Sequence, residues 1–405
     1  MDPIPNLMAP SLRKDPYPVY AELRREHPIC RVEPGGLWAV SRYSDVLAIL
    51  RDPARFSNQA FQAAWQPPWV GYNPLANSVL ALDPPVHTRL RALVTRAFGN
   101  RSISRLEPRV QEVAGRLAAA LDEQVEFISA FAMPLPAFAI GEILGLGQVD
   151  GPGRDPGNGN GRALHGRFKA WADDILSVTP AQPADGQAER VRSAIAELTG
   201  HLEAVVRSRR AAPGDDVTSD LLAARVDGQA LSDREVIDFL VTLLLGGLET
   251  TTHLLGNSAL LLAERPELLE RLRAEPALVP RFVDEMIRYD GPSQALPRVT
   301  TTEVELAGVR LPPGTLVLAL VGSANRDERQ FPNPDRFDLA RGQLGLQFGF
   351  GVHYCIGAAL ARLEATAAVQ ALVARVGRIR LAGEVEYNQT LTVRGPARLP
   401  LQLEF

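Results

Sequence analysis

The sequence predicts a mainly α-helical protein with small β-sheets, arranged as a single domain. Apolar residues recur with the spacing of amphipathic helices through most of the chain between positions 83 and 290. Strand-like, β-branched segments are short, and they gather near the beginning of the chain and in its last third. No linker rich in serine or charge divides the 405 residues, so we expect one domain over 1–405, although the length alone would allow two or three.

The expected elements can be given in chain order. The first 80 residues belong to a β-richer minor portion, with helices at 19–26 and 43–51 and a strand at 37–41. The helical major portion covers about 83–290 and 355–376, with its clearest helices at 107–121, 138–144, 166–176, 188–210 and 233–264. Late strands are expected within 299–321 and 385–405, specifically at 299–306, 316–321 and 391–393. The Gly/Pro/Asn-rich run 147–161 is expected to form a surface loop within the fold.

The composition excludes several classes of function. Lys and Arg number 43 against 47 Asp and Glu, and the net charge of −4 excludes a strong overall attraction to nucleic acid. The first residues carry prolines and charges but lack the apolar core of a secretory signal peptide. The most apolar stretch, 236–263, contains Asp238, Glu249 and His253, which a membrane span would rarely tolerate. We therefore expect a soluble cytoplasmic protein that binds neither nucleic acid nor membranes.

Cys30 and Cys355 are the two cysteines, too few for a disulfide framework or a zinc site. Cys355 follows a glycine-rich, aromatic turn and precedes a stretch with helical periodicity. A thiolate just before a helix is stabilised by unpaired N–H groups and by the positive end of the helix dipole. The residues alone leave three roles open for Cys355: a buried structural cysteine, a nucleophile with His353 as its base, or a metal ligand.

The expected helix 233–264 contains a second unusual pattern. Ser232 and Glu235 form a capping box at its start. Gly246 and Gly247 lie in its middle, where each glycine costs about 1 kcal/mol relative to alanine. A kink or the close approach of a ligand usually explains such glycines, and the acid and hydroxyl that follow could then transfer protons. By itself, however, the pattern favours a helix-packing glycine pair with a surface glutamate.

Two further pairs share helix faces. Glu285 and Arg288 are three residues apart and can form an ion pair, which on a surface is worth only about 0–1 kcal/mol. His87 and Arg91 are four residues apart in a helix expected to start at Asp83, and two such groups suit a carboxylate ligand. For this second pair the residues alone favour an exposed helix face.

The residues around Cys355 match a long signature. Phe-x-x-Gly-x-His/Arg-x-Cys-x-Gly is matched by Phe348, Gly351, His353, Cys355 and Gly357. In the long helix, residues 246–251 match Ala/Gly-Gly-x-Asp/Glu-Thr-Thr/Ser. On these motifs the sequence resembles the cytochrome P-450 superfamily, in particular its soluble bacterial haem-thiolate monooxygenases. The resemblance implies the cytochrome P-450 fold, with haem between the long central helix and the loop and helix that carry the cysteine.

The resemblance also implies roles for individual residues. Cys355 would be the proximal ligand of the haem iron, Glu249 and Thr250 would deliver protons, and Gly246 would line the haem-facing groove. The other residues assigned to cofactor binding are Phe348 and Gly357 beside the cysteine and, at the haem propionates, His87, Arg91, Arg298 and His353. A buried structural cluster would consist of Glu285, Arg288 and Arg336.

The implied function is the insertion of one atom of O2 into a mainly apolar organic substrate, by hydroxylation or epoxidation, in bacterial secondary or xenobiotic metabolism. The cofactor would be haem b, and electrons would come from a ferredoxin or flavodoxin, with NAD(P)H acting only indirectly. Arg362, on the helix after the cysteine, is the leading contact for such a partner, with a structural ion pair as the alternative. The residues expected to contact substrate are Leu243, Gln294, Ala295, Leu296 and Leu391.

Two alternatives remain open at this point. A haem-thiolate peroxygenase or isomerase, or a non-catalytic haem-containing module that binds partners, would share the cysteine motif. Such proteins often lack the acid and the alcohol of the helix motif. Because this chain has both Glu249 and Thr250, the sequence favours a monooxygenase.

Overall fold

The computed structural model describes residues 6–33, 35–145, 160–179 and 181–405. The chain forms two compact units. The first unit comprises Met1–Ser57, Gln111–Leu135 and Thr250–Phe405, and the second comprises Asn58–Val110 and Pro136–Glu249. Three of the four boundaries fall inside helices, namely α6 (Asn100–Ala119), α7 (Pro134–Ile143) and α11 (Asp233–Glu264), and the fourth follows Ser57. That the 405 residues form a single domain stays a prediction.

The first unit is built around a five-stranded sheet with the strand order β1-β2-β8-β5-β3. Its strands are β1 (Ile29–Val32), β2 (Leu37–Val40), β8 (Leu316–Ala319), β5 (Leu296–Thr300) and β3 (Phe56–Ser57). β2 pairs with β8 in parallel, and the other pairs are antiparallel. α3 (Tyr43–Arg51) has the predicted bounds and shares an apolar core with the sheet through Val46, Ile49 and Val317. This core fixes β5, which carries predicted site residues.

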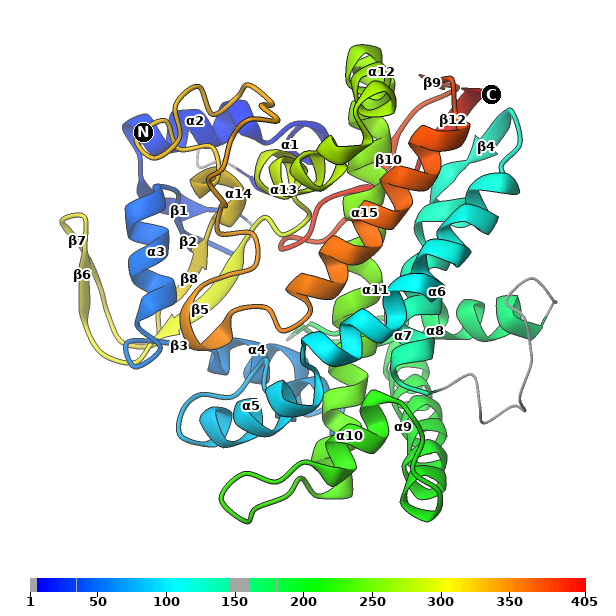
Figure 1. Cartoon of the computed structure of the whole chain (residues 1–405). Coiled ribbons are helices and arrows are strands. Elements are labelled where there is room, and N and C mark those ends of the chain that lie inside the picture. The colour runs from blue at the N-terminus through cyan, green and yellow to red at the C-terminus, as the bar shows by residue number, and fades with distance from the viewer. Residues whose placement is uncertain (1–5, 34, 146–159, 180) are drawn as a thin grey trace. The chain divides into compact units, whose positions relative to one another are not determined.

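Smaller sheets in the same unit come mostly from the late part of the chain (Figure 1). β4 (Gln124–Glu126), β12 (Pro400–Glu404) and β9 (Arg378–Leu381) form one of them. Two strand pairs complete the set, β10 (Glu386–Tyr387) with β11 (Pro396–Arg398) and β6 (Val304–Leu306) with β7 (Val309–Leu311). The late strands predicted within 299–321 and 385–405 are therefore present, with different bounds.

The three specific late strands differ from the prediction. The segment 299–306 is divided between β5 and β6, because Thr300 pairs with Thr315 at the end of β5 while β6 forms its own hairpin with β7. The segment 316–321 ends as a strand at Ala319, since α14 (Val321–Ala324) begins directly afterwards. The segment 391–393 is wrong as a strand: its Val393 makes an isolated bridge to Ser293.

The first unit contains helices from both ends of the chain. Besides α3, α14 and the second half of α11 they are α1 (Pro10–Lys14), α2 (Tyr17–Glu26), α12 (Pro266–Ala274), α13 (Val279–Asp290) and α15 (Ala358–Arg375). A proline lies in the first turn of α1, α2, α12 and α13, where its fixed φ suits the helix and its missing N–H loses no helical bond. Shorter helical turns occupy Ile128–Ala132, Pro276–Leu278 and Gly351–His353.

The second unit is mainly helical. It contains α4 (Gln59–Trp65), α5 (Val86–Ala97), α8 (Asn160–Leu176), α9 (Gln187–Ala211), α10 (Val217–Ala223) and a short turn at Leu75–Asn77, with most of α7 and the first half of α11. The helices predicted between 107 and 210 correspond to α6, α7, α8 and α9 with shifted ends. The run 147–161 lies outside the described residues except for its last two, with which α8 begins.

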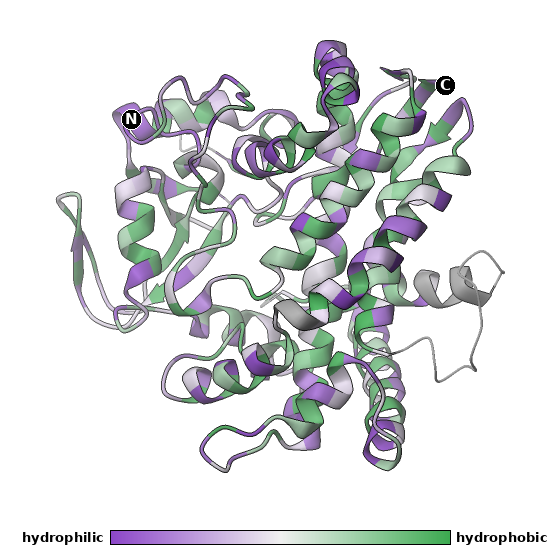
Figure 2. Ribbon diagram, in the orientation of Figure 1, coloured by the Kyte–Doolittle hydropathy of each residue, from purple (hydrophilic) through white to green (hydrophobic). Residues whose placement is uncertain are grey.

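α11 has the bounds that the sequence predicted. Its capping box is formed, because the Ser232 N–H donates to Glu235 Oε2 at 2.8 Å and the Glu235 N–H donates to Ser232 Oγ at 3.2 Å. Among the described residues it is the one helix long and apolar enough to cross a membrane, but 72% of its most apolar window is buried inside the structure. Figure 2 shows the apolar residues along it, and their burial is typical of a core helix.

Candidate functional site

The loop before Cys355 is a tight turn that depends on glycine. Gly349 and Gly351 have φ angles of 71° and 70°, a region that residues with a Cβ rarely adopt. A Cβ on Gly351 would also lie 3.0 Å from the carbonyl oxygen of Leu50. The Cys355 N–H donates to the carbonyl of Phe348 at 2.8 Å and closes the loop. The turn predicted at Gly351 is therefore present.

Cys355 stands directly before α15, which begins at Ala358 with Gly357 as its N-cap residue. Cys355 is exposed, whereas Cys30 in β1 is half-buried and burial raises the pKa of its thiol. The first N–H groups of α15 and the positive end of its dipole favour a thiolate at position 355. The structure thus contradicts a buried structural role for Cys355 and leaves a ligand or a nucleophile.

The side chains around the loop form a packed group. The guanidinium carbon of Arg362 lies 4.7 Å from the centre of the Phe348 ring, and Tyr354 approaches the same ring edge-on. Arg362 Nε donates to Asp284 Oδ1 at 2.8 Å. Arg362 therefore makes the structural ion pair that was the alternative to a partner contact, and it also covers Phe348.

The donor set at Cys355 tests whether a haem would fit. Among the residues that the structure describes, no group of three or more His, Cys, Asp or Glu side chains could hold a metal ion. Cys355 would therefore act as a single sulfur ligand, which suits a metal that brings its other ligands, as iron does in haem. Its exposure and the cations predicted for the propionates are compatible with this cofactor.

The two glycines in the middle of α11 serve different purposes. A Cβ on Gly247 would lie 2.6 Å from Ile140 Cδ1, so this glycine allows α7 to pack against α11. A Cβ on Gly246 would have no described atom within 4 Å apart from the helix's own backbone and its chain neighbours. Open space beside the backbone at Gly246 is what the close approach of a ligand requires. Glu249 and Thr250, both half-buried, follow one turn later.

The four residues predicted at the propionates lie in a helix, a strand and a turn. In the second unit His87 and Arg91 occupy α5, and His87 is 1% exposed. Burial, followed by the charge of Arg91, lowers the pKa of His87, so its imidazole is neutral at pH 7. In the first unit Arg298 is buried in β5, and the half-buried His353 belongs to the turn before Cys355.

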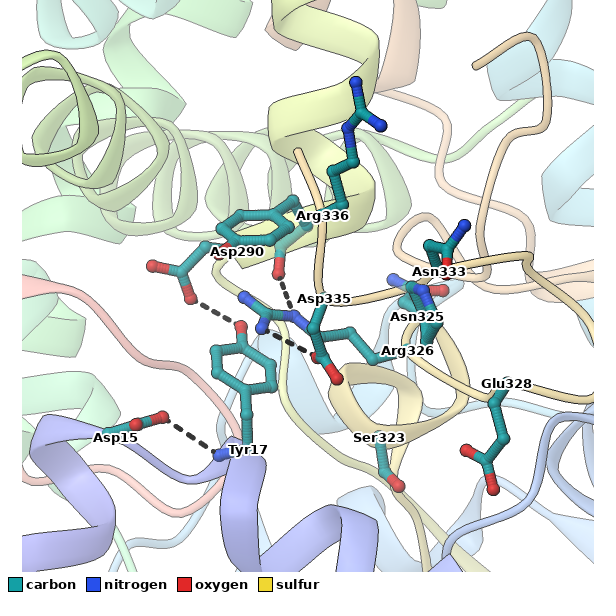
Figure 3. Close-up of polar contacts among 12 residues, drawn as sticks. Asp15, Tyr17, Asp290, Ser323, Asn325, Arg326, Glu328, Asn333, Asp335 and Arg336 are labelled. Atoms are coloured by element: carbon teal, nitrogen blue, oxygen red, sulfur yellow. Dashed lines mark hydrogen bonds and ion pairs between the residues drawn. The ribbon is translucent and has the colours of Figure 1, made fainter. Parts of the chain in front are cut away.

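The structural cluster at the end of α13 is present with a different third member. Arg288 forms two hydrogen bonds with Glu285, at 2.8 Å and 2.7 Å, and both side chains are buried. The third residue is Arg341, whose Nε lies 3.1 Å from Glu285 Oε1. The prediction of Arg336 is wrong: Arg336 is exposed, and its carbonyl accepts a hydrogen bond from Arg341. In Figure 3 its guanidinium points away from Arg326 and the residues around it.

The five predicted substrate contacts have different exposures. Gln294 is 1% exposed, its Nε2 donates to the carbonyl of Gly291 at 2.9 Å, and its Oε1 lies where a Cβ on Gly322 would stand. Ala295 is also 1% exposed, so the prediction that these two side chains touch substrate is wrong in this structure. Leu243 is 7% exposed. Leu296 and Leu391 are half-buried, and both remain candidates.

Sequence reasoning missed a buried acid on α15. Glu364 is 1% exposed, and burial raises its pKa to about 8, while a hydrogen bond from Thr251 lowers it in part. The side chain is therefore mostly protonated at pH 7, and its Oε1 has no partner among the described atoms. The signal in the sequence was a single glutamate among the alanine and leucine residues of the α15 core face.

A second buried acid, Asp238, served in the sequence analysis only as evidence against a membrane span. Asp238 of α11 is 3% exposed and accepts a hydrogen bond from the Tyr72 hydroxyl at 2.5 Å. Arg234 lies 3.3 Å from the same carboxylate and stacks over the Tyr72 ring at 3.8 Å. Burial raises the pKa of Asp238 to about 6, although Tyr72 and Arg234 oppose the shift. These contacts hold the loop around Tyr72 to α11.

Comparison with known proteins bears on these features. A model of the cytochrome P-450 family matches residues 174–376. The chain is 39% identical over 348 residues to the erythromycin C-12 hydroxylase of Saccharopolyspora erythraea, covering 85% of this chain and 83% of that protein. It is 38% identical over 401 residues to the cytochrome P-450 monooxygenase PikC of Streptomyces venezuelae, covering 96% and 91%. Its structure matches that of cytochrome P-450 CYP109Q5 from Chondromyces apiculatus with a TM-score of 0.87 and 38% identity, covering 98% and 97%.

The helical fold and the exposed cysteine before α15 fit the class of haem-thiolate proteins. Within that class, the chain belongs to the cytochrome P-450 family and is a monooxygenase. The predicted fold and family are therefore confirmed.

Proposed function

We propose that this chain is a bacterial haem b monooxygenase of secondary metabolism that hydroxylates or epoxidises a mainly apolar small molecule. The observation that carries the proposal is the exposed Cys355 at the start of α15, inside the complete family signature. Kinship to an erythromycin C-12 hydroxylase favours a secondary metabolite as substrate. We also propose a single cytochrome P-450 domain over 1–405 and a cytoplasmic location.

The residues that would hold the cofactor follow from the site. Cys355 would bind the iron, with Phe348 packed beside it, while His87, Arg91, Arg298 and His353 would face the propionates. When bound, thiolate-ligated haem supplies the binding of O2 and the cleavage of its O–O bond. Arg91 and Arg298 suit this role because guanidinium groups form paired hydrogen bonds with carboxylates.

The reaction requires two electrons and two protons for each O2, because one oxygen atom enters the substrate and the other leaves as water. The Thr250 hydroxyl can both donate and accept a hydrogen bond, so it can hold a proton at the reacting oxygen. Glu249, adjacent in α11, can exchange that proton with water. Leu248 is buried beside them and has no group that could do so. Open space at Gly246 would admit the small ligand.

The electrons would come from a ferredoxin or flavodoxin, with NAD(P)H used only by its reductase. Phe350, Val352 and Tyr354 are 38%, 40% and 42% exposed on the cysteine loop and could contact such a partner. Arg362 is 27% exposed beside them, although its pair with Asp284 reduces its free charge. Electrostatic attraction to an acidic partner would weaken as salt is added.

A labelled-oxygen experiment tests the proposal. A compound library is first screened for the shift of the haem Soret band that substrate binding produces. The selected compound is then incubated with the holoenzyme, a ferredoxin system and isotopically labelled O2. We expect one labelled oxygen atom in the product. Product that carries only unlabelled oxygen from water would contradict the proposal. Product formed with hydrogen peroxide but not with O2 and reductant would also contradict it and favour the peroxygenase alternative.

A further inference from the structure

The loop 388–394 is held in place by a residue from the opposite end of the chain. Arg13 of α1 is 4% exposed. Its Nη2 donates to Asn388 Oδ1 at 3.0 Å and to the Val393 carbonyl at 2.6 Å, and its Nε donates to the Asn388 carbonyl at 3.2 Å. One guanidinium therefore bonds both ends of the loop.

Arg394, at the end of the loop, in turn bonds the backbone of α1. This residue is also 4% exposed, and its Nε and Nη2 donate to the carbonyls of Arg13 and Lys14 at 2.9 Å and 2.6 Å. Its Nη1 donates to Asp290 Oδ1 at 2.6 Å. The same oxygen accepts the Tyr17 hydroxyl at 2.5 Å, as Figure 3 shows. Two arginines thus connect α1, the loop and the end of α13 reciprocally.

A further arginine stiffens the N-terminal side of this connection. The guanidinium of Arg326 lies 3.4 Å from the centre of the Tyr17 ring and 3.7 Å from that of Tyr289. It also donates to the Tyr289 carbonyl at 2.8 Å and to Asp335 at 3.2 Å. A cation between two aromatic rings is attracted by both. The start of α2, which follows α1 after two residues, is therefore held in place by contacts with the rest of the unit.

The tip of the loop is hydrogen-bonded to the two residues that precede β5. The carbonyl of Thr392 accepts hydrogen bonds from the N–H groups of Gln294 and Ala295, at 2.7 Å and 3.3 Å. Leu391 packs in one apolar cluster that also contains Leu12 and Ala295. The next residue, Leu296, lies 3.8 Å from the position of a Cβ on Gly349, in the cysteine loop. The connection thus runs from Arg13 to the two half-buried residues that remain candidate substrate contacts.

We propose that Arg13 is a positioning residue for substrate specificity, acting through the loop 388–394 on Leu391 and Leu296. It touches neither of these two side chains directly. The proposal rests on the proposed function, because it requires that Leu391 and Leu296 face the substrate. Removal of the guanidinium would leave the Asn388 and Val393 acceptors short of a donor and free the tip to move.

The test uses three variants of the haem-loaded enzyme. Arg13→Ala removes all the donors, and Arg13→Lys keeps the charge but cannot reproduce the planar fork. Arg24→Ala is the matched control: Arg24 is 2% exposed, and its described side-chain hydrogen bonds go to Ser323 and Glu328 and not to the loop. Hydrogen exchange is measured at the amides of Gln294 and Ala295, together with substrate affinity from the Soret shift and the ratio of products.

In Arg13→Ala we expect exchange at these two amides to rise by about tenfold, since the loss of one hydrogen-bonded support is worth about that factor. Substrate affinity should fall or the ratio of products should change, with the carbon monoxide spectrum of the haem unaltered. Arg13→Lys should lie between Arg13→Ala and wild type, and Arg24→Ala should leave both amides protected.

Unchanged exchange at Gln294 and Ala295 in Arg13→Ala would overturn the proposal. Faster exchange with unaltered affinity and products would overturn the positioning role while leaving the monooxygenase intact. Failure of the proposed function would be seen separately, as the absence of labelled product from the wild-type enzyme.

Discussion

Two buried glutamates in the first unit have opposite surroundings. Glu285, in the second half of α13, lies between Arg288 and Arg341, and its Oε1 also accepts the Asp338 N–H at 3.0 Å. Glu364, in the core face of α15, receives a hydrogen bond from Thr251, while its Oε1 has no partner among the described atoms. The first carboxylate is neutralised by cations, and the second stays mostly protonated.

The difference separates a residue that builds the fold from one that the fold tolerates. Two guanidinium groups on Glu285 join α13 to the segment 334–341, because Arg288 also donates to the Pro334 carbonyl at 3.0 Å. Glu364 is joined to α11 by the hydrogen bond from Thr251, with no cation among the causes of its pKa shift, and its burial raises its pKa to about 8. The same residue type, equally buried, therefore has a different energetic role according to its partners.

The largest expected effect is on stability, when the ion pair between Glu285 and Arg341 is removed. Arg341→Ala should destabilise the protein by about 3–5 kcal/mol, because it leaves part of a buried charge uncompensated. Arg336→Ala is the matched control in the same segment, and it should change stability by no more than about 0.5 kcal/mol. Urea unfolding of both variants decides the point. Equal losses in the two variants would show that the segment, and not the ion pair, supplies the stability.

The next effect is on catalysis, at the turn of α11 that precedes Thr251. Thr250→Ala should consume reductant at a comparable rate but convert at least about tenfold less of it into product, because positioned proton donors typically contribute about 10²–10⁴. Thr250→Ser keeps the hydroxyl and should restore most of the yield. Product and hydrogen peroxide are measured per NAD(P)H consumed. Unchanged yield in Thr250→Ala would mean that protons arrive by another route.

The raised pKa of Glu364 should be visible in the pH dependence of the free energy of unfolding. The pKa of Glu364 is raised from 4.5 to about 8 on folding, so the folded chain binds more protons than the unfolded chain between these values. Its contribution is fully present below pH 4.5 and is lost as pH rises towards 8, by about 1.4 kcal/mol per pH unit. Glu364→Gln should lack this slope in urea unfolding at several pH values. Parallel curves for variant and wild type would show that the acid is already ionised or solvated.

The smallest expected effect concerns Asp238, which is intermediate between the two glutamates. Its pKa is raised from 3.8 to about 6, so its contribution is present below pH 3.8 and lost as pH rises to 6. Asp238→Asn should remove this pH dependence while keeping an acceptor for the Tyr72 hydroxyl. Calorimetric melting at pH 5 and pH 7 gives the comparison. A larger difference in the variant than in wild type would contradict the assignment.

The local parts of the site could be predicted from the sequence, and the long-range parts could not. The turn at Gly351, the helix after Cys355 and the bounds of α11 depend on neighbouring residues, and all were correctly predicted. Arg336 and Arg341 are five residues apart in one loop, and the sequence does not show which of them approaches the Glu285 carboxylate. The path of the loop in the tertiary structure decides it.

The same reason explains the other errors. Gln294 and Ala295 were predicted to contact substrate from their positions in the chain. In the structure the Gln294 side chain packs against Gly322, and Ala295 belongs to an apolar cluster, so both are covered by protein. The hydrogen bond from Arg394 to the Arg13 carbonyl joins residues that are 381 positions apart, and no local sequence pattern predicts it. Contacts of this kind become visible only in the tertiary structure.

The measurement that tests the account most directly is the carbon monoxide difference spectrum of the reduced, haem-loaded protein. Wild type and Cys30→Ser should both absorb at the position specific for a thiolate ligand, because Cys355 alone is exposed before a helix. Cys355→Ser should lose that absorption even when it retains haem. A thiolate spectrum that persists in Cys355→Ser, or that disappears in Cys30→Ser, would contradict the assignment of Cys355 as the ligand.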